Sequence, residues 1–207
     1  NLLPFFQDQR YIRVDGKPLF CVYRPKEIPD TDVFIDTWQR LAQENGLDGV
    51  FFVALRFQGE SKTEELDYYD GVTTLRPTFQ DYVLPAVLRR FLNNGNFRLL
   101  PHIHSYDKAV EAAFGEDYED TFPCVSAGWD NTPRCGRAGH VYLGTTPKKF
   151  GRHLRNAVAT LAEAPAERRI VFVRSWNEWA EGNIIEPCRQ NGQGYLEQIR
   201  QVVYGVG

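Results

Sequence analysis

The stretch Gly49-Val50-Phe51-Phe52-Val53-Ala54-Leu55 is a continuous apolar run in which hydrophobic and polar side chains do not alternate. A run of this kind is typical of a parallel strand that is covered on both faces of a sheet. The preceding residues 32–46 have helical periodicity, with Asp32 as the expected N-cap and Asn45-Gly46 as the expected end. A helix that leads directly into a buried strand indicates an α/β protein.

Four other apolar runs extend this alternation along the chain. They predict strands at residues 18–23, 97–104, 122–127 and 169–176. Hydrophobic residues at helical spacing predict further helices around residues 84–92, 107–114, 146–161 and 195–202. Alternating strands and helices imply a parallel sheet with right-handed crossovers. Five units are too few to close an eight-stranded barrel, so two architectures remain open: an open doubly wound sheet, and most of a barrel that lacks its first units.

Composition and charge exclude several classes of protein. The 207 residues include 24 Lys and Arg against 27 Asp and Glu, and the formal net charge is -3. Nucleic-acid binding through a cationic face is therefore not expected. The 43% of hydrophobic residues suffices for a packed core, yet no apolar stretch approaches the roughly 20 residues that span a bilayer. The start has no signal-peptide pattern, which predicts a cytoplasmic location, and the absence of Met predicts a processed chain or a fragment.

Metal and cofactor motifs are sparse. None of the four cysteines forms a C-x-x-C pair, and Cys135 and Cys188 fall in predicted loops, where they can meet. His102 and His104 share one side of a predicted strand, but a third metal ligand is not apparent. The sequence contains neither a G-x-G-x-x-G nor a G-x-x-x-x-G-K-[ST] nucleotide fingerprint. We therefore expect no metal and no cofactor.

Residues that can carry chemistry follow the last predicted strand, at the edge where parallel sheets bind their ligands. Glu178 and Glu181 lie three residues apart, and in a turn this spacing can bring both carboxylates toward one cleft. Glycoside hydrolysis needs such a pair, because one group protonates the leaving oxygen while the other assists at the anomeric carbon. We interpret the two acids as catalytic candidates, with solvated loop carboxylates as the alternative. Tryptophan faces can stack on sugar rings while polar groups bind hydroxyls. The candidate substrate-binding neighbours are Trp176, Asn177, Trp179 and Glu186.

A second cluster follows the fourth predicted strand, in the sequence Gly128-Trp129-Asp130-Asn131-Thr132-Pro133-Arg134. It combines a ring, a carboxylate, an amide and a guanidinium, which suit the binding of a polyol. The candidate substrate-binding residues here are Trp129, Asp130, Asn131 and Arg134. The alternative is a capping turn in which Asp130 and Asn131 bond to the nearby backbone.

Tyr23 and Arg24 follow the first predicted strand and are also candidate substrate-binding residues. Arg24 can anchor an acidic group, or it can hold a catalytic carboxylate through a bidentate pair. A structural ion pair explains this arginine equally well.

Four motifs together form a specific combination. They are Phe6-x-Asp8-x-Arg10-Tyr11-Ile12-x-Val14-Asp15-Gly16-Lys17-Pro18-Leu19-Phe20, Tyr23-Arg24-Pro25, Gly128-Trp129-Asp130-Asn131-Thr132-Pro133-Arg134, and Trp176-Asn177-Glu178-Trp179-Ala180-Glu181-Gly182 with Glu186-Pro187. This combination resembles the WbsX-like proteins, which are often labelled glycosyltransferases of lipopolysaccharide biosynthesis. Those proteins are similar to the family-99 glycoside hydrolases, which are endo-acting α-mannosidases and mannanases.

The resemblance implies a (β/α)8 TIM barrel. On that template, residues 1–207 form a single partial barrel domain without a second domain, and their five strands are the fourth to the eighth. The first three units would come from a missing N-terminal segment or from another chain. In the hydrolases, an N-E-W-x-E motif supplies both carboxylates, which implies that Glu178 assists at the sugar 2-hydroxyl and that Glu181 is the general acid/base. The hydrolase resemblance implies neither a metal nor a nucleotide cofactor.

The sequence thus predicts a carbohydrate-active enzyme that acts on a glycosidic bond of a glycan, such as a mannose-containing one or a surface polysaccharide. One alternative is a glycosyltransferase of lipopolysaccharide or O-antigen biosynthesis. The one D-x-D match that a metal-dependent transferase would use, Asp30-Thr31-Asp32, fits a helix start better. A second alternative is a sugar-binding half-domain without catalysis, since an incomplete barrel leaves sheet edges unpaired.

Overall fold

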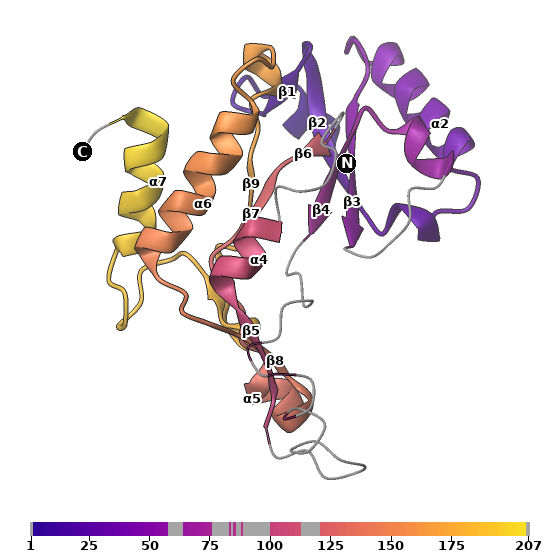
Figure 1. The fold of residues 1–207 in the computed structure, drawn as a ribbon. Coiled ribbons are helices and arrows are strands. Elements are labelled where there is room, and N and C mark those ends of the chain that lie inside the picture. Colours follow the sequence, from indigo (N-terminus) through magenta and orange to yellow (C-terminus); the bar gives the residue numbers. More distant parts are fainter. Residues whose placement is uncertain are drawn as a thin grey trace. The chain divides into compact units, whose positions relative to one another are not determined.

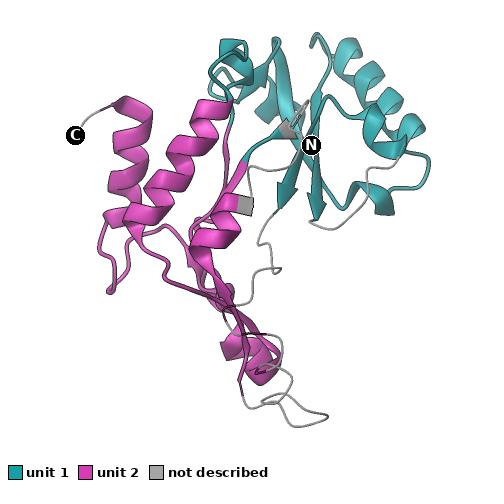
Figure 2. Ribbon diagram, viewed as in Figure 1, with its two compact units in different colours: residues 1–75, 118–123, 161–170 teal, residues 76–117, 124–160, 171–207 magenta. Residues whose placement is uncertain are grey.

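The computed structural model describes residues 2–57, 64–75, 100–112 and 121–205, together with residues 83, 85 and 88. Figure 1 shows the course of the chain, and Figure 2 shows its division into two compact units. Unit 1 comprises residues 1–75, 118–123 and 161–170, and unit 2 comprises residues 76–117, 124–160 and 171–207. The single domain over residues 1–207 stays a prediction.

Unit 1 is built on a five-stranded sheet with the order β1-β2-β3-β4-β6. The strands are β1 (Arg13–Val14), β2 (Lys17–Tyr23), β3 (Phe51–Phe57), β4 (Gly71–Leu75) and β6 (Thr121–Phe122). β1 and β2 form an antiparallel hairpin, and the other neighbours pair in parallel. The strands predicted at residues 18–23 and 49–55 are confirmed. The burial of β3 on both faces is confirmed as well, because every residue from Phe51 to Ala54 is buried.

The sequence analysis missed β4, which lies between β3 and β6. Its threonines Thr73 and Thr74 are buried, although their hydroxyl groups make the segment look polar in sequence. Gly71 begins the strand under the ring of Phe122, since a Cβ atom at this position would lie 2.6 Å from that ring. The glycine therefore permits the close packing of β6 on β4.

Helix α2 (Thr31–Glu44) covers the sheet of unit 1 beside β3 (Figure 1). It ends at Asn45-Gly46 as predicted, but Asp32 lies within its first turn, so the predicted Asp32 cap is wrong. The N-cap is Asp30, whose φ of 49° turns the chain before the helix begins. The Thr31 hydroxyl closes this turn by donating to the Ile28 carbonyl oxygen at 3.2 Å. The remaining helical segments of unit 1 are α1 (Leu3–Phe6), η1 (Pro25–Glu27), η2 (Glu64–Tyr68) and η4 (Ala166–Arg168).

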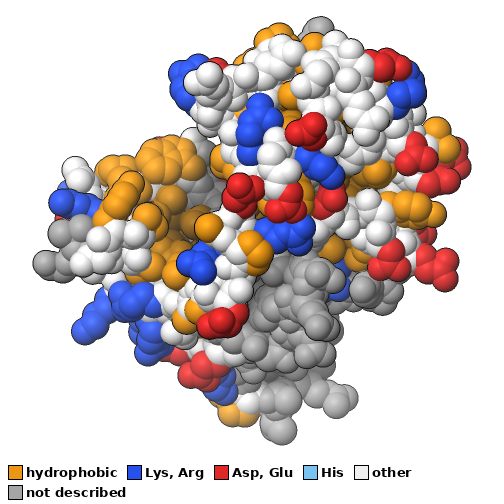
Figure 3. All heavy atoms as spheres, turned by 90° about the horizontal axis from the view of Figure 1, so that it is seen from above, with side chains coloured by type: hydrophobic (Ala, Val, Ile, Leu, Met, Phe, Trp, Pro, Cys, Tyr) orange, Lys and Arg blue, Asp and Glu red, His pale blue; other side chains and the backbone are white. Residues whose placement is uncertain are grey.

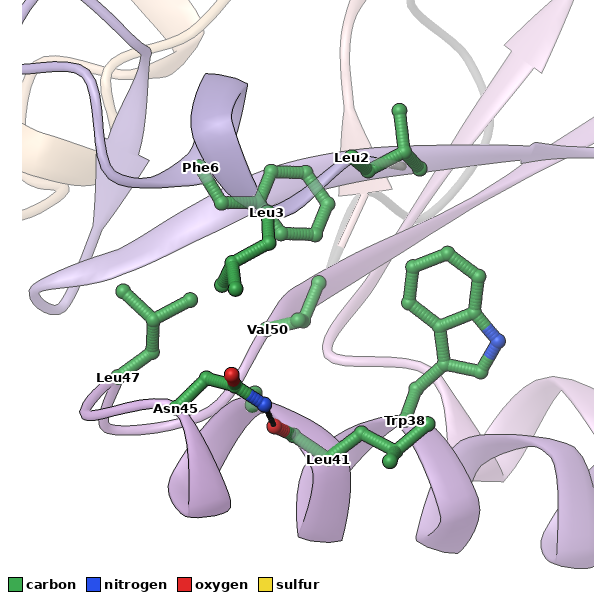
Figure 4. A pocket seen from close by; sticks show the side chains of 9 residues that line it. Leu2, Leu3, Phe6, Trp38, Leu41, Asn45, Leu47 and Val50 are labelled. Atoms are coloured by element: carbon green, nitrogen blue, oxygen red, sulfur yellow. Dashed lines mark hydrogen bonds between the residues drawn. The ribbon is translucent and has the colours of Figure 1, made fainter.

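Aromatic rings fill the core between α2 and the sheet. Phe20 stacks on Trp38 with ring centroids 5.2 Å apart, and Phe52 meets Phe20 edge to face at 6.1 Å. An apolar hollow of about 510 Å³ opens beside this core (Figure 4). Its lining residues are Leu2, Leu3, Phe6, Trp38, Leu41, Ala42, Asn45, Leu47 and Val50.

The described residues of unit 2 form three two-stranded sheets. The strands are β5 (His102–Ser105), β7 (Cys124–Ser126), β8 (His140–Leu143), β9 (Phe172–Arg174), β10 (Asn177–Glu178) and β11 (Asn183–Ile184). β5 pairs with β8 and β7 pairs with β9, both in parallel, whereas β10 and β11 form an antiparallel hairpin. The helical segments are α4 (Tyr106–Ala112), α5 (Thr132–Cys135), η3 (Gly136–Ala138), α6 (Pro147–Thr160), η5 (Trp179–Glu181) and α7 (Gly194–Tyr204).

Helices α6 and α7 lie side by side and share a core with β7 and β9 (Figure 1). Phe150 of α6 and Tyr195 of α7 meet edge to face with ring centroids 5.4 Å apart, and they are buried together with Val125 of β7. Gly151 brings the two helices together, because a Cβ atom there would overlap the side chain of Gln198. The helices predicted at residues 146–161 and 195–202 are confirmed, and α4 confirms the described part of the helix predicted at residues 107–114.

The other predicted elements differ from the structure or lie outside it. The strand predicted at residues 169–176 is limited to β9, because Arg169 is held in the preceding loop by a bond from its Nε atom to the Ala164 carbonyl oxygen (2.9 Å). β5 begins at His102, directly after Pro101, which has no backbone donor, and residues 97–99 of the predicted strand 97–104 lie outside the described residues. The sequence analysis missed β8, and the helix predicted around residues 84–92 falls almost wholly outside the described residues.

Parallel strands followed by helices make this a mixed α/β fold. The strand pairs that the described residues form do not confirm a barrel of five units. In the described part of the chain, no helix combines the length and the apolar composition that a membrane span requires. Figure 3 shows acidic and basic side chains interspersed on one face, in keeping with the nearly balanced charge.

Candidate functional site

Two of the predicted clusters lie in unit 2 and follow the same edge of one strand pair. β7 and β9 are parallel, with Ser126 opposite Arg174 at their carboxyl ends. The Ala127 amide donates to the Arg174 carbonyl oxygen at 3.2 Å and continues the pairing by one step. β7 leads into residues 128–134, here called the Trp129 turn, and β9 leads into residues 176–186, here called the Trp hairpin. Their proximity follows directly from the parallel pairing.

The Trp hairpin is a compact loop closed on itself. β10 and β11 pair Asn177 with Ile184 and Glu178 with Asn183, and η5 connects them. At the base, the Ser175 hydroxyl donates to the Asn183 carbonyl oxygen at 2.6 Å. The Ile185 and Glu186 amides both donate to the Trp176 carbonyl oxygen at 3.1 Å. The two glutamates of the N-E-W-x-E motif are therefore carried by a structured turn and not by an open loop.

Gly182 joins the Trp hairpin to the Trp129 turn. Its φ is 56°, in the left-handed region that glycine adopts without strain. A Cβ atom at Gly182 would lie only 3.0 Å from the Asp130 Cβ atom. At the same place, the Asp130 amide donates to the Glu181 carbonyl oxygen at 2.7 Å. Only glycine satisfies both the turn and this close approach.

Glu181 is the anchored carboxylate of the pair. Its side chain is 16% exposed, and its two oxygens contact two different guanidinium groups. Arg134 of α5 binds one oxygen, and the Arg174 Nη2 atom lies 3.2 Å from the other. Arg174 also stacks on Trp129, with its Cζ atom 4.7 Å from the ring centroid. These contacts fix the orientation of the Glu181 carboxylate and connect it to α5 and to β9.

Glu178 differs from Glu181 in its surroundings. It is exposed on β10, and its backbone amide donates to the Ser175 hydroxyl at 3.3 Å. The described residues supply neither an ion pair nor a hydrogen bond to the Glu178 carboxylate. One acid of the pair is thus held by cations, while the other is available to solvent or ligand.

Two tryptophans of the Trp hairpin are presented to solvent. Trp176 is 52% exposed and Trp179 is 56% exposed, whereas Trp129 is only 7% exposed. The Trp179 indole donates its Nε1 hydrogen to the Glu186 carboxylate, which sets the direction of the ring. An indole that is both exposed and oriented is suited to stack on the apolar face of a sugar ring.

One carboxylate oxygen of Asp130 and the side-chain oxygen of Asn131 accept hydrogen bonds within the fold. Asp130 Oδ1 accepts from the Thr132 amide at 2.9 Å and from the Thr132 hydroxyl at 2.6 Å. Asn131 Oδ1 accepts from the His140 amide of β8 at 2.7 Å. These bonds match the alternative of a turn held by its own polar side chains, and a direct role of either residue in substrate binding stays a prediction.

Two buried tyrosines fix the backbone just before the Trp129 turn. The Tyr106 hydroxyl donates to the Ser126 carbonyl oxygen at 2.6 Å, and the Tyr195 hydroxyl donates to the Ala127 carbonyl oxygen at 3.3 Å. Burial raises the pKa of both phenols above its ordinary value, so they remain neutral donors. The strand end that carries the site is therefore supported from α4 and from α7.

Tyr23 and Arg24 lie in unit 1, at the end of β2. Tyr23 is exposed, and the Arg24 guanidinium lies over its ring with the Cζ atom 5.6 Å from the centroid. Arg24 also pairs with Glu27 at 2.7 Å, and this carboxylate raises the pKa of the guanidinium. The ion pair fits the structural interpretation of Arg24, and membership of both residues in the site of unit 2 stays a prediction.

Sequence reasoning missed several residues at the site. Arg174 binds Glu181, and its position as the last residue of an apolar strand before the N-E-W-x-E motif was the available signal. His140 was also missed, although it lies between the predicted pair: its Nδ1 atom is 3.0 Å from the His104 Nε2 atom, and its ring stacks on His102. Within the described ranges, no group of three or more potential ligands is arranged to hold a metal ion. Cys135 and Cys188 are free thiols.

Comparison with known proteins gives three findings. The family model described as Glycosyltransferase WbsX matches residues 1–199. Two relatives named "Uncharacterized protein WxcX", from two strains of Xanthomonas campestris pv. campestris, are each 28% identical over 201 residues. The match covers 96% of this chain but only 28% of each relative, so the chain spans less than a third of their length.

A solved structure named "Glycoside hydrolase-like protein" has the same fold, with a TM-score of 0.64 at 18% identity. It is matched over 96% of this chain and 57% of its own length. At this identity the likeness concerns the fold. Because the family model extends over nearly the whole chain, the protein belongs to the Glycosyltransferase WbsX family of carbohydrate-active proteins.

Proposed function

We propose that this chain carries the catalytic carboxylates of an enzyme that cleaves a glycosidic bond, with Glu178 and Glu181 as the catalytic pair. The observation that carries the proposal is the joint departure of the Trp hairpin and the Trp129 turn from the carboxyl ends of β7 and β9. Two glutamates, two oriented arginines and two half-exposed indoles are gathered there. This combination suits a polar ring with an apolar face, which is the chemistry of a sugar.

The two glutamates receive different roles. Glu181, whose carboxylate is directed by Arg134 and Arg174, is the proposed group that exchanges a proton with the glycosidic oxygen. Glu178, which is exposed and has a free carboxylate among the described residues, is the proposed group that assists at the sugar 2-hydroxyl. Trp176, Asn177 and Trp179 would hold the sugar from the Trp hairpin, with Glu186 orienting Trp179.

The finer architecture is also a proposal. The five strands predicted from the sequence would correspond to the fourth to eighth strands of a (β/α)8 barrel. Two observations support this assignment. Parallel strands followed by helices recur in this chain, and its fold is similar to that of the solved structure, with a TM-score of 0.64. The solved neighbour is longer, since the match covers 57% of its length. The remaining barrel units would then come from another segment of a longer protein or from another chain.

The test is to replace each acid by its amide in the full-length protein. Glu178→Gln and Glu181→Gln should each lower the rate of glycan cleavage by about 100-fold or more, because a positioned acid or base contributes about that factor. Release of reducing ends from α-mannan and from other polysaccharides gives the rate. Glu197→Gln, at an exposed position of α7, is the matched control and should retain full activity. Unchanged turnover in both site variants would refute the proposed catalytic pair.

A glycosyltransferase is the second candidate, and the family description favours it. Such an enzyme would transfer a sugar from a nucleoside diphosphate sugar, whose binding usually requires a metal held by acidic residues. Of the D-x-D match, Asp30 is the N-cap of α2 and Asp32 lies in its first turn. Calorimetry with nucleoside diphosphate sugars and Mn²⁺ separates the candidates: tight, metal-dependent binding would favour transfer. Glycan binding without release of reducing ends, and without binding of nucleoside diphosphate sugars, would favour the non-catalytic sugar-binding alternative.

A further inference from the structure

We propose that the hollow beside the Trp129 turn is a subsite for a sugar that bears a carboxylate, and that Arg189 pairs with this carboxylate. The inference rests on the proposed function, because it names the class of glycan that the site of unit 2 accepts. The hollow has a volume of about 480 Å³, within the range of roughly 300–1,000 Å³ that is typical of ligand pockets.

Several segments of unit 2 enclose this hollow, and its lining includes Val141 and Tyr142 of β8, Thr145, and Tyr195 of α7. The Trp129 turn contributes Trp129 and Asp130, the Trp hairpin contributes Trp179, and residues 188–191 contribute Arg189, Gln190 and Asn191. Glu178 and Glu181 are not among its lining residues. A sugar in the hollow would therefore occupy a position next to the catalytic pair and not the position of the bond that is cleaved.

The segment that carries Arg189 has a fixed geometry. Cys188 and Gly192 exchange two backbone hydrogen bonds, with the Gly192 amide donating at 2.8 Å and the Cys188 amide donating at 3.2 Å. Gly192 closes the turn with a φ of 55°. Three consecutive polar residues, Arg189, Gln190 and Asn191, are thus presented from one closed turn. A site built on such a turn loses little entropy when a ligand binds.

The charge of Arg189 is not compensated within the described residues. Its guanidinium makes neither an ion pair nor a hydrogen bond there, in contrast to Arg134 and Arg174, which share Glu181. The other charged residue of the lining is Asp130, and one of its oxygens already accepts two bonds from Thr132. A guanidinium binds a carboxylate through two parallel hydrogen bonds, which makes a carboxylate the best complement to Arg189.

The rest of the lining suits the remainder of an acidic sugar. Trp179 offers a largely exposed ring that is held in position by Glu186. The side-chain amides of Gln190 and Asn191 can donate to hydroxyl oxygens and accept from hydroxyl hydrogens. A ring face, hydroxyl groups and one carboxylate are the three features that a uronic acid combines.

The experiment compares acidic oligosaccharides with their own neutral forms. Oligomers of galacturonic, glucuronic and mannuronic acid are each titrated into the full-length protein by calorimetry, alongside the same oligomers after carboxyl reduction. We expect at least one acidic oligomer to bind about tenfold or more tightly than its reduced form, as one hydrogen-bonded ion pair provides. Arg189→Gln should remove this preference and leave the affinity for the reduced form within about twofold. Arg200→Gln, at an exposed arginine of α7 without an ion pair among the described residues, should change neither.

The outcomes separate this inference from the proposed function. Equal affinity of the wild-type protein for every acidic oligomer and its reduced form, or a preference that survives in Arg189→Gln, would overturn the subsite. If the subsite fails while the Glu178 and Glu181 variants still lose turnover, the proposed hydrolase stands without it. If Arg189→Gln removes the acid preference while those variants keep full turnover, the acidic subsite stands and the catalytic pair is refuted.

Discussion

β3 of unit 1 and the Trp hairpin of unit 2 are both rich in aromatic residues, and they use them in opposite ways. In β3, Phe51 and Phe52 are buried on the two faces of the sheet. In the Trp hairpin, Trp176 and Trp179 are more than half exposed. Burial of a large ring stabilises a fold, whereas a large ring held in solvent stabilises little and is available for a ligand. We therefore propose that the first group of rings stabilises the fold and that the second group binds a ligand.

The two regions also differ in what holds them. β3 pairs with β2 on one side and with β4 on the other over five residues each. The two strands of the Trp hairpin have two residues each, and the loop relies on contacts from its neighbours, namely the Asp130 amide and the guanidinium groups of Arg134 and Arg174. Substitutions in β3 should therefore change the free energy of unfolding, while substitutions in the Trp hairpin should change function more than stability.

The largest expected effect is in β3. Phe52→Ala should lower the free energy of unfolding by about 3–5 kcal/mol, because it removes a fully buried ring that Phe20, Phe34 and Trp38 surround. Urea denaturation followed by circular dichroism measures the loss. Val33→Ala, at an exposed position of α2, is the control and should stay within about 0.5 kcal/mol of the parent protein. A loss below about 1 kcal/mol for Phe52→Ala would contradict the burial of β3.

An intermediate effect is expected at the junction of the two site segments. Gly182→Ala should cost about 1–3 kcal/mol from its left-handed backbone, and the approach to Asp130 should add to this loss. Gly205→Ala has nearly the same backbone conformation (φ 63°) without any neighbour within 4 Å, so it isolates the backbone contribution. Glycan cleavage should fall in the Gly182 variant and not in the control. Equal stability losses and full activity in both variants would show that the contact with Asp130 is unimportant.

The smallest effect on stability is expected at Trp176. Trp176→Ala should change the free energy of unfolding by less than about 0.5 kcal/mol, because the ring is half exposed. The affinity for a glycan substrate should nevertheless fall by about two- to tenfold if the ring stacks on a sugar. Calorimetry measures the affinity, and Tyr204→Ala serves as a control at another exposed aromatic residue. A destabilised variant with normal affinity would reverse the assignment of this ring.

The elements that sequence reasoning found are those with a strong one-dimensional pattern. β3 is uniformly apolar, and α2 and α6 repeat hydrophobic residues at helical spacing. β4 and β8 are short and contain polar residues, namely Thr73 and Thr74 in β4 and His140 in β8. The placement of these residues in a strand depends on partner strands that are distant in the sequence. Local patterns cannot reveal such partners, because the pairing that stabilises these strands is made by the folded chain.

For the candidate site, the sequence supplied the two motifs but not their connections. The strand ends that carry Trp129 and Glu178 could be predicted from the apolar runs before them. Three contacts could not be predicted. Gly182 and Asp130 lie on different turns, and the contacts of Arg174 with Glu181 and of Trp179 with Glu186 depend on the shape of the hairpin. The contact between Gly182 and Asp130 arises from the parallel pairing of β7 and β9, which no motif encodes by itself.

The Arg174 guanidinium binds the Glu181 carboxylate through a nitrogen at its edge, and its flat face lies over the Trp129 ring. A lysine cannot reproduce this double contact, since its ammonium group is a point charge without a flat surface. Mutagenesis that aims to change the ligand of this candidate site should therefore vary positions 129, 174 and 181 together. A library that randomises position 129 or 181 alone would mostly remove one partner of the guanidinium, and a library that randomises position 174 alone would mostly remove the guanidinium itself.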